Sequence, residues 1–290
     1  MSKMEVKRVK GKAVKRNVLI TVIVLLVLLF LGILFVFPMY WTFITSFKLK
    51  SQIFVEKPIL WPSVLYLDNY IEIFRKSFVG TFFLNSLKVA GTTTGGTILL
   101  ATMCAFAICR YDFKISKLIK NFIITVRMIP ALVYTIPYYI IFNKLGLLDS
   151  LAGLVLAYVT FSLPLAVWLS VNFFVDIPKE IYESAEIDGC GEMKMYSIIG
   201  LPLIRTGIVV IAILVFIGAW NEFGLALVLQ SSDLKKTLPI GIASMIQTHK
   251  DTPSGSLAAA GMIAIIPGII LSLSTQKYFI KGMMTGAVKG

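Results

Sequence analysis

Long apolar segments recur along the whole chain and limit the folds that are open to it. The first, Val18 to Phe37, holds 20 residues without a charge, and a helix of about 20 apolar residues is long enough to cross a bilayer. Hydrophobic residues make up 57% of the chain and charged residues only 15%, whereas about a quarter of the residues in a soluble domain are charged. The sequence therefore predicts an all-α integral membrane protein.

Six segments have the length and apolarity of membrane spans. The expected organisation is a basic segment over residues 1–17, a transmembrane domain over residues 18–280 and a tail over residues 281–290. Some spans contain glycine and threonine, as in 91–97, and small residues allow membrane helices to pack closely. The six predicted spans are residues 18–37, 82–109, 121–143, 151–175, 203–229 and 257–278.

Basic residues indicate how the spans are oriented. Seven of the first 16 residues are lysine or arginine, directly before an apolar run that is too long for a cleaved signal peptide. Six spans place both termini on one side, where the loops and termini hold 17 basic residues against 9 on the other side. By the positive-inside rule, both termini are expected in the cytoplasm. The net charge of +13 is explained in this way, so nucleic acid is not an expected partner and membrane lipid is.

A polar loop over residues 176–202 separates the fourth and fifth predicted spans. Its residues 178–202 hold five of the 15 acidic residues of the chain. Pro178 and two early glutamates suit the start of a short helix, and Gly189 and Gly191 suit its end. A second short helix is expected over residues 192–199. The small residues Ser184 and Ala185 favour close contact with another protein, although a solvated amphipathic connector would show a similar pattern.

The spacing within this loop resembles a known motif. Glu183-Ser184-Ala185, three residues, Gly189, nine residues and Ile199-Gly200-Leu201-Pro202 resemble the EAA motif of binding-protein-dependent ABC importer permeases, with Ser184 replacing an alanine. Other matching stretches point to the carbohydrate branch and to its maltose-type subunit. They are residues 67–70, 85–86, 110–113, 127–130, 136–137, 146–147, 177–180, 187–189, 220–223 and 286–290.

The resemblance implies a type I ABC importer permease core in a prokaryotic inner or plasma membrane. The loop over residues 176–202 would contain a coupling helix that sits in a cleft of a cytoplasmic ATPase. Closure of two ATPase subunits would then drive alternating access in this chain and a second permease subunit, with sugar delivered by an extracytoplasmic solute-binding protein. The residues implied in ATPase coupling are Glu180, Glu183, Ser184, Ala185, Asp188, Gly189, Leu201 and Pro202, and the tail residues Gly286, Lys289 and Gly290 would also reach the ATPase.

ATP chemistry is expected in the partner and not in this chain. The sequence has no GxxxxGK[ST] loop, which cradles nucleotide phosphates in ATPases. ATP and Mg²⁺ would therefore bind only to the partner ATPase. Three separated cysteines and a single histidine predict neither a metal site nor a disulfide framework. The chain has no recognisable set of catalytic residues and is not expected to be an enzyme.

Polar residues inside the predicted spans are candidates for contact with the cargo, because such residues usually face a cavity or a partner. Arg127, Tyr134 and Tyr138 could together stack on a sugar and hydrogen-bond it. Asn221 and Glu222 form a second candidate pair in the fifth span. Arg127 could instead pair within a subunit interface, Asn221 could pack between helices, and Glu222 could end the membrane-embedded stretch.

Two other transport functions fit part of the pattern. The same fold could import a polyol or a glycerol phosphate, in which case Arg127 would meet an anion. An ion-coupled secondary transporter is the alternative from a different class, and it would need ion-coupling carboxylates near the middle of the membrane. Glu222 is the only acid within the predicted spans, and it lies nearer the outer side. The sequence therefore favours an ATP-driven sugar importer.

Overall fold

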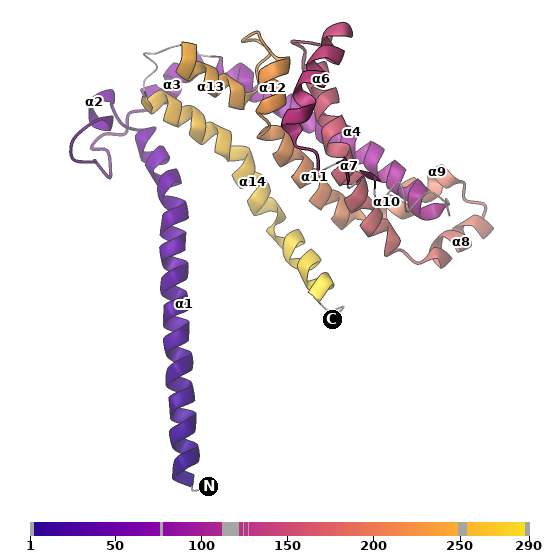
Figure 1. The fold of residues 1–290 in the computed structure, drawn as a ribbon, viewed down its shortest axis with the longest axis horizontal. Helices are drawn as coiled ribbons and strands as arrows, with labels where there is room; N and C mark the ends of the chain where they lie inside the picture. The colour runs from indigo at the N-terminus through magenta and orange to yellow at the C-terminus, as the bar shows by residue number, and fades with distance from the viewer. Residues whose placement is uncertain are drawn as a thin grey trace. The chain divides into compact units, whose positions relative to one another are not determined.

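The structure is a computed structural model that describes residues 3–75, 78–111, 122–123, 125–126, 128–248 and 254–287. Throughout this described part the regular elements are helices, which confirms the all-α prediction (Figure 1). In chain order they are α1 (Lys3–Thr45), α2 (Lys50–Ile53), α3 (Asp68–Arg75), α4 (Val79–Arg110), α6 (Ala131–Lys144), α7 (Leu151–Val175), α8 (Lys179–Ile187), α9 (Glu192–Lys194), the π-helix η1 (Met195–Gly200), α10 (Leu201–Leu203), α11 (Arg205–Trp220), α12 (Gly224–Leu229), α13 (Leu238–Thr248) and α14 (Ser254–Ala287).

The helices belong to two compact units. The first comprises Met1–Ile71 and Pro253–Met262, and the second comprises Glu72–Thr252 and Ile263–Gly290. In the first unit, the amide nitrogen of Asn69 donates hydrogen bonds of 3.0 Å to the carbonyl oxygens of Ser46 and Lys48. Asn69 therefore holds the turn that follows α1 against the start of α3.

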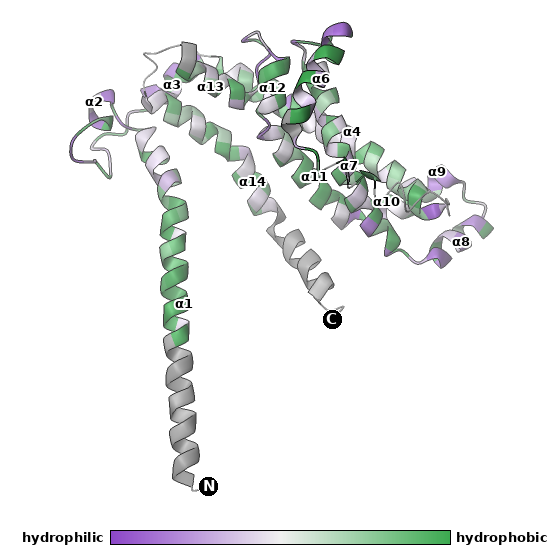
Figure 2. Ribbon diagram, viewed as in Figure 1, coloured by the Kyte–Doolittle hydropathy of each residue, from purple (hydrophilic) through white to green (hydrophobic). Residues whose placement is uncertain are grey.

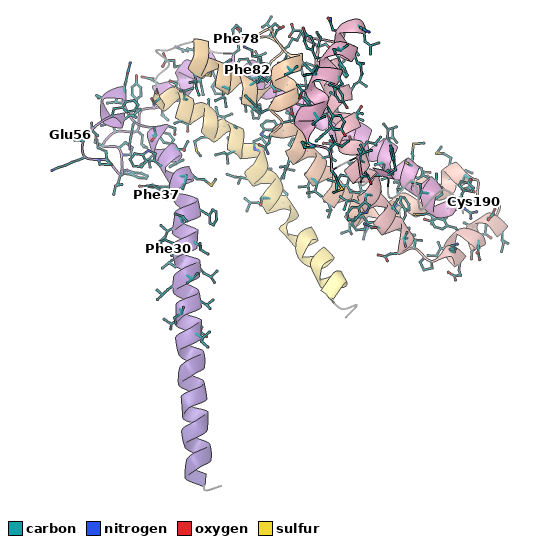
Figure 3. The ribbon with its side chains drawn as sticks, viewed as in Figure 1. Phe30, Phe37, Glu56, Phe78, Phe82 and Cys190 are labelled. Atoms are coloured by element: carbon teal, nitrogen blue, oxygen red, sulfur yellow. The ribbon has the colours of Figure 1, made fainter. Side chains whose placement is uncertain are left out.

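Helix α1 is apolar on every side over its described side chains. From Ile20 to Met39 each side chain is exposed, and Figure 2 colours most of this stretch as hydrophobic. Phe30 and Phe37 project from the helix into open space, with exposed fractions of 65% and 51% (Figure 3). A helix that is hydrophobic all round requires an apolar environment, and lipid supplies one for a membrane span.

The core of the second unit consists of α4, α7 and α11, which lie alongside one another (Figure 1). Small residues allow these helices to approach closely. Thr93 and Thr97 of α4 are fully buried, in agreement with the close packing predicted for this glycine- and threonine-rich segment. A Cβ atom added to Gly207 of α11 would lie 2.4 Å from the ring of Phe173 on α7. Glycine is therefore required at that crossing.

Among the described residues, four helices are long and apolar enough to cross a membrane, namely α1, α4, α7 and α14. A fifth candidate is the pair formed by residues 192–203 and α11, which is bent by 80°. The run predicted at residues 121–143 is described only in part, and the 14-residue helix α6 covers it from Ala131 onward. The six spans and the cytoplasmic position of both termini therefore stay predictions.

The fifth predicted run, residues 203–229, is divided by its polar pair. Helix α11 ends at Trp220. The side-chain nitrogen Nδ2 of Asn221 donates a 3.0 Å hydrogen bond to the carbonyl oxygen of Ile217. The carboxylate of Glu222 accepts hydrogen bonds from the backbone nitrogens of Leu225 and Ala226 at 2.8 and 3.1 Å. Side-chain acceptors of this kind start helices. Asn221 and Glu222 thus end one helix and begin the next.

Candidate functional site

The loop over residues 176–202 lies at one end of the second unit, beyond the ends of α4 and α7 (Figure 1). Its first helix, α8, starts after Pro178, which occupies the N-cap position instead of the predicted first turn. At its other end, the backbone nitrogen of Gly189 donates to the carbonyl of Glu186, and that of Cys190 donates to the carbonyl of Ala185. These two bonds form a Schellman motif. Gly189 has a φ of +75°, so the predicted stop at this glycine is confirmed.

The two faces of α8 have different environments. Tyr182 and Ala185 are buried in the core of the chain, with exposed fractions of 7% and 9%, and burial raises the pKa of Tyr182 to about 12. Ile187 is 87% exposed. The predicted coupling residues Glu180, Glu183, Ser184 and Asp188 are exposed as well. Ala185 differs from the expectation, because its small side chain packs against this chain and leaves little surface for a partner.

The second limb of the loop is helical but irregular. The predicted helix over residues 192–199 is divided into α9 and the π-helix η1, and α10 follows. Leu201 is half-buried and Pro202 is exposed at the first turn of α10. The chain then bends by 80° into α11. Single-turn π segments occur frequently at functional sites, and this one connects α9 to α10, just before the bend into α11.

An aromatic cluster joins both limbs of the loop to the core helices. Phe106 of α4, which is 7% exposed, lies at its centre. The centroid of its ring is 5.8 Å from that of Phe174 on α7, 5.7 Å from that of Tyr182 on α8 and 5.6 Å from that of Tyr196 on η1. Aromatic pairs at these separations add to the stabilisation that burial alone provides. The loop is therefore packed onto the ends of α4 and α7.

One cation contacts both limbs as well. The Nη2 atom of Arg110, the last residue of α4, lies 2.7 Å from the Oε2 atom of Glu186 on α8. Its Nε atom lies 3.5 Å from the Oε1 atom of Glu192 on α9. The two carboxylates stand on either side of the turn at Gly189. In Figure 3, the labelled Cys190 marks this turn at the far end of the second unit.

The predicted cargo residues of α6 line a small cavity. Tyr134 and Tyr138 have ring centroids 6.4 Å apart and nearly perpendicular rings, and they face a cavity of about 90 Å³ together with Thr160, Phe161 and Pro164. The hydroxyl of Tyr134 donates a 3.0 Å hydrogen bond to the carbonyl of Val126. Arg127 lies outside the described residues. The structure thus brings two of the three members of this predicted group together.

Asn221 and Glu222 face different spaces, although they are neighbours in sequence. Glu222 lines a cavity of about 80 Å³ beside Tyr158, Phe161 and Gly218. Asn221 lines a groove of about 360 Å³ between α11 and α14. In this groove Phe216 and Trp220 stack with an interplanar angle of 10°. Phe161 lines both smaller cavities, so the spaces beside Glu222 and beside Tyr134 and Tyr138 adjoin each other, whereas Asn221 faces the groove.

The predicted contacts of the tail are described only in part. Gly286 lies within α14, which continues to Ala287. Lys289 and Gly290 lie outside the described residues.

The segment that contains this loop matches a family of transport proteins. Residues 97–285 match the family described as "Binding-protein-dependent transport system inner membrane component". This range runs from the middle of α4 to the end of α14 and includes both limbs of the loop. The chain belongs to this family. It is therefore a permease component of the inner membrane and not an enzyme, and it works in a system that depends on a binding protein.

Relatives of known description agree with this family over most of the chain. The permease is 35% identical over 254 residues to the trehalose transport system permease protein SugB of Mycobacterium tuberculosis. The aligned residues cover 87% of this chain and 92% of SugB. The permease is also 35% identical over 255 residues to the sulfoquinovosyl glycerol transport system permease protein SmoH of Agrobacterium fabrum, covering 88% and 89% of the two chains.

The fold of the permease has a solved counterpart. A chain from the crystal structure of a bacterial ABC transporter involved in the import of the acidic polysaccharide alginate superposes with a TM-score of 0.75. The superposition covers 96% of this permease and 99% of that chain, with 20% sequence identity. At this identity the likeness shows the fold alone, and that fold agrees with the predicted permease core.

Sequence reasoning missed the residues of α4 that hold the loop. Thr102, Phe106 and Arg110 recur at intervals of four, a spacing that places side chains on one face of a helix. The sequence predicts a span packed through its small residues, and Arg110 enters that prediction only as a basic residue of the following loop and as a matching position. The available signal was the four-residue spacing of these side chains at the end of a span, together with an acidic loop further along the chain that could pair with Arg110. Tyr158, which donates to Glu222, was also missed.

Proposed function

We propose that this permease is the membrane-spanning subunit of an ATP-driven importer for mono- or oligosaccharides. Its family membership establishes binding-protein-dependent transport, and the relatives supply the class of cargo. SugB is named for trehalose and SmoH for sulfoquinovosyl glycerol. The alginate transporter adds a polysaccharide. All three names contain a sugar unit, which supports a sugar as the cargo here.

The loop over residues 176–202 transmits movement of the ATPase partner to the membrane helices. The single observation that carries this proposal is the division of α8 into a face buried in the core and an exposed face. On the buried face Tyr182 packs against Phe106 of α4, so displacement of α8 would move the core helices. On the exposed face Glu183, Ile187 and Asp188 are free to meet another protein. An apolar side chain surrounded by acids suits a complementary cleft.

The complete importer would contain several further chains. Two ATPase subunits would hold ATP and Mg²⁺ and would close on each other, and a second permease of similar fold would complete the pathway. The binding protein would deliver cargo from outside the cell. We further propose six spans with both termini in the cytoplasm, which places the acidic loop on the side of the ATPase. The tail residues Gly286, Lys289 and Gly290 would contact the ATPase from the same side.

Cargo would pass beside the aromatic residues that line the cavities of the second unit. Tyr134 and Tyr138 line a small cavity, and Phe216 and Trp220 form a stacked pair in the groove that Asn221 also lines. Flat aromatic faces with a nearby amide suit the apolar face and the hydroxyls of a sugar. Arg127 and Glu222 remain candidates for polar contacts along the same pathway.

Reconstitution of the complete complex tests this function. The permease is expressed with its partner chains, purified through a tag on this chain and placed in proteoliposomes with ATP inside. Uptake of a radiolabelled sugar should require ATP, the ATPase and the binding protein. A preparation in which this chain alone moves solute along an ion gradient, with no need for ATP, would contradict the proposal and favour a secondary transporter.

A negatively charged cargo is the second candidate. SmoH is named for a sulfonated glycoside, and the neighbour of similar fold belongs to a transporter of an acidic polysaccharide. Arg127 would then face the anion. Glycerol phosphates belong to this anionic class, whereas polyols belong with the neutral cargoes. Competition for uptake by neutral and anionic glycosides, measured in the reconstituted complex, separates the two cargo classes.

A further inference from the structure

One face of α4 contacts both limbs of the acidic loop through three residues at intervals of four. The hydroxyls of Thr102 and Tyr196 are 2.9 Å apart. One turn later, Phe106 packs against Tyr182 and Tyr196. After another turn, Arg110 reaches the carboxylates of Glu186 and Glu192. The contacts thus change from a buried hydroxyl pair to an aromatic cluster and then to an ion pair network at the edge.

The contacts of Arg110 connect two parts of the loop that lie on opposite sides of the turn at Gly189. Glu186 precedes the turn at Gly189, and Glu192 follows it. No Cβ is present at Gly189, and nothing lies within 4 Å of the position where one would be. Between the two acids the turn is closed by the backbone hydrogen bonds of Gly189 and Cys190, and Cys190 packs against the core cluster. A guanidinium group carries several donors in a fixed planar arrangement and can serve two carboxylates at once.

We propose that Arg110 is a positioning residue that holds α8 and α9 in a fixed orientation at the end of α4. This inference rests on the proposed function, in which α8 receives the movement of the ATPase. With both acids held by one group on α4, a push on α8 moves α4 together with the whole turn. Without that group, α8 can rock about the turn at Gly189, and part of the movement is lost before it reaches the core.

The role of Arg110 is separable from the stability of the fold. The side chain of Arg110 is 18% exposed, but its partners Glu186 and Glu192 are 61% and 42% exposed. Exposed ion pairs add little to folding stability because water screens them. The aromatic cluster at Phe106 supplies the apolar packing. Loss of the charge should therefore leave a folded and assembled permease whose loop is less well oriented.

Cys190 provides a reporter in the turn itself. Its backbone nitrogen closes the Schellman motif onto Ala185 at 2.9 Å, and its side chain is half-buried. In the full-length chain, with Cys104→Ser and Cys109→Ala to silence the other thiols, the rate of maleimide labelling reports how often the turn opens. Two exposed ion pairs correspond to a change of roughly threefold to tenfold in such a local equilibrium. Arg110→Gln should raise the labelling rate of Cys190 by this factor.

Matched variants identify the cause of any change. Lys236→Gln removes a 2.6 Å ion pair with Asp233 elsewhere in the same unit and should leave the labelling of Cys190 unchanged. Arg110→Lys keeps the charge but reaches one acid at a time, so it should give an intermediate rate. Combining Arg110→Gln with Glu186→Gln should add little to the effect of Arg110→Gln alone, because both remove the same contact. If the Arg110→Gln protein cannot be recovered from the membrane, the labelling rate of Cys190 is measured in Glu186→Gln and Glu192→Gln instead. Each of these variants removes one of the two contacts of Arg110 and should also raise the labelling rate.

The coupling of the complete importer supplies the second readout. Arg110→Gln should raise the number of ATP molecules hydrolysed per sugar imported, while the ATPase still copurifies in normal amounts. A labelling rate at Cys190 that stays at the wild-type value in Arg110→Gln and Glu186→Gln would overturn the positioning role, whatever the function of the loop. A raised labelling rate together with an unchanged ATP-to-sugar ratio supports the positioning of the turn and contradicts the proposed coupling function of α8.

Discussion

The hydroxyl of Tyr158 donates a 2.6 Å hydrogen bond to the carboxylate of Glu222, a residue 64 positions further along the chain. Tyr158 lies on α7 and is 2% exposed. The same carboxylate accepts the backbone nitrogens of Leu225 and Ala226 at the start of α12. Glu222 thus starts a helix and satisfies a buried hydroxyl of another helix at the same time.

Replacing Glu222 by alanine should destabilise the permease by about 2–4 kcal/mol, from the loss of a helix cap together with a buried hydroxyl left without a partner. Thermal unfolding in detergent, followed by fluorescence, measures the effect. Tyr158→Phe is the matched control, because it removes the hydroxyl and leaves the cap in place. The account is wrong if the two variants unfold at the same temperature.

Replacing Gly189 by valine should abolish transport and coupling to the ATPase while leaving membrane insertion intact. The left-handed φ of +75° at this position costs a residue with a Cβ about 1–2 kcal/mol, and more when it is β-branched. Gly191→Val is the control, because Gly191 has a φ of −71° and open space around its Cβ position. Uptake assays on both variants check the prediction, and equal uptake by Gly189→Val and the wild type would refute the role of the turn.

The crossing of α7 and α11 should tolerate no side chain at Gly207. A Cβ there would lie 2.4 Å from ring atoms of Phe173, and forcing extra atoms into a packed core costs about 1–3 kcal/mol. Gly218→Ala on the same helix is the matched variant, because nothing lies within 4 Å of its Cβ position and alanine favours helix by about 1 kcal/mol. Thermal unfolding should show Gly207→Ala less stable than the wild type and Gly218→Ala at least as stable.

Asp149 should make the stability of the permease depend on acidic pH. Its Oδ1 atom accepts hydrogen bonds of 3.0 Å from the backbone nitrogens of Ser231 and Ser232. Partial burial would by itself raise the pKa of Asp149, but the bonds from Ser232 and Ser231 outweigh it and lower the pKa below its ordinary value of 3.8. A lowered folded-state pKa means that this stabilisation is complete above 3.8 and disappears as the pH falls through the lowered value.

The variant Asp149→Asn tests this dependence. Asparagine keeps an acceptor oxygen and tolerates the φ of 52° at this position, but it does not titrate. The wild type should unfold at the higher temperature near neutral pH, and the difference should shrink as the pH falls below 3.8. A difference that does not change with pH would show that the charge of Asp149 contributes nothing.

The sequence predicted the features that depend on local pattern. Apolar runs gave the long helices, and Gly189 gave the end of α8 because a left-handed turn favours glycine. The sequence marks Glu222 as a candidate end of the membrane-embedded stretch, but it does not show the helix boundary that Glu222 forms there. Part of its cause is the hydroxyl of Tyr158, which lies far away in sequence.

The faces of the loop were also beyond local pattern. Ala185 was expected to meet a partner, but it packs inside the chain because Phe106 and its aromatic neighbours occupy that side. The pairing of Arg110 with Glu186 spans 76 positions and depends on how α4 and α8 meet. Contacts of this kind are set by tertiary packing, which a single sequence does not display.

Photo-crosslinking from Ile187 tests the central claim most directly. This side chain is the most exposed one among the large apolar residues of α8, at 87%, and the account places it against the ATPase. A photoreactive amino acid at position 187 in native membranes should give an adduct that contains a nucleotide-binding ATPase, and the same group at the buried Tyr182 should not. Adducts with lipid alone, or equal ATPase adducts from both positions, would contradict the assignment of α8 as the coupling helix.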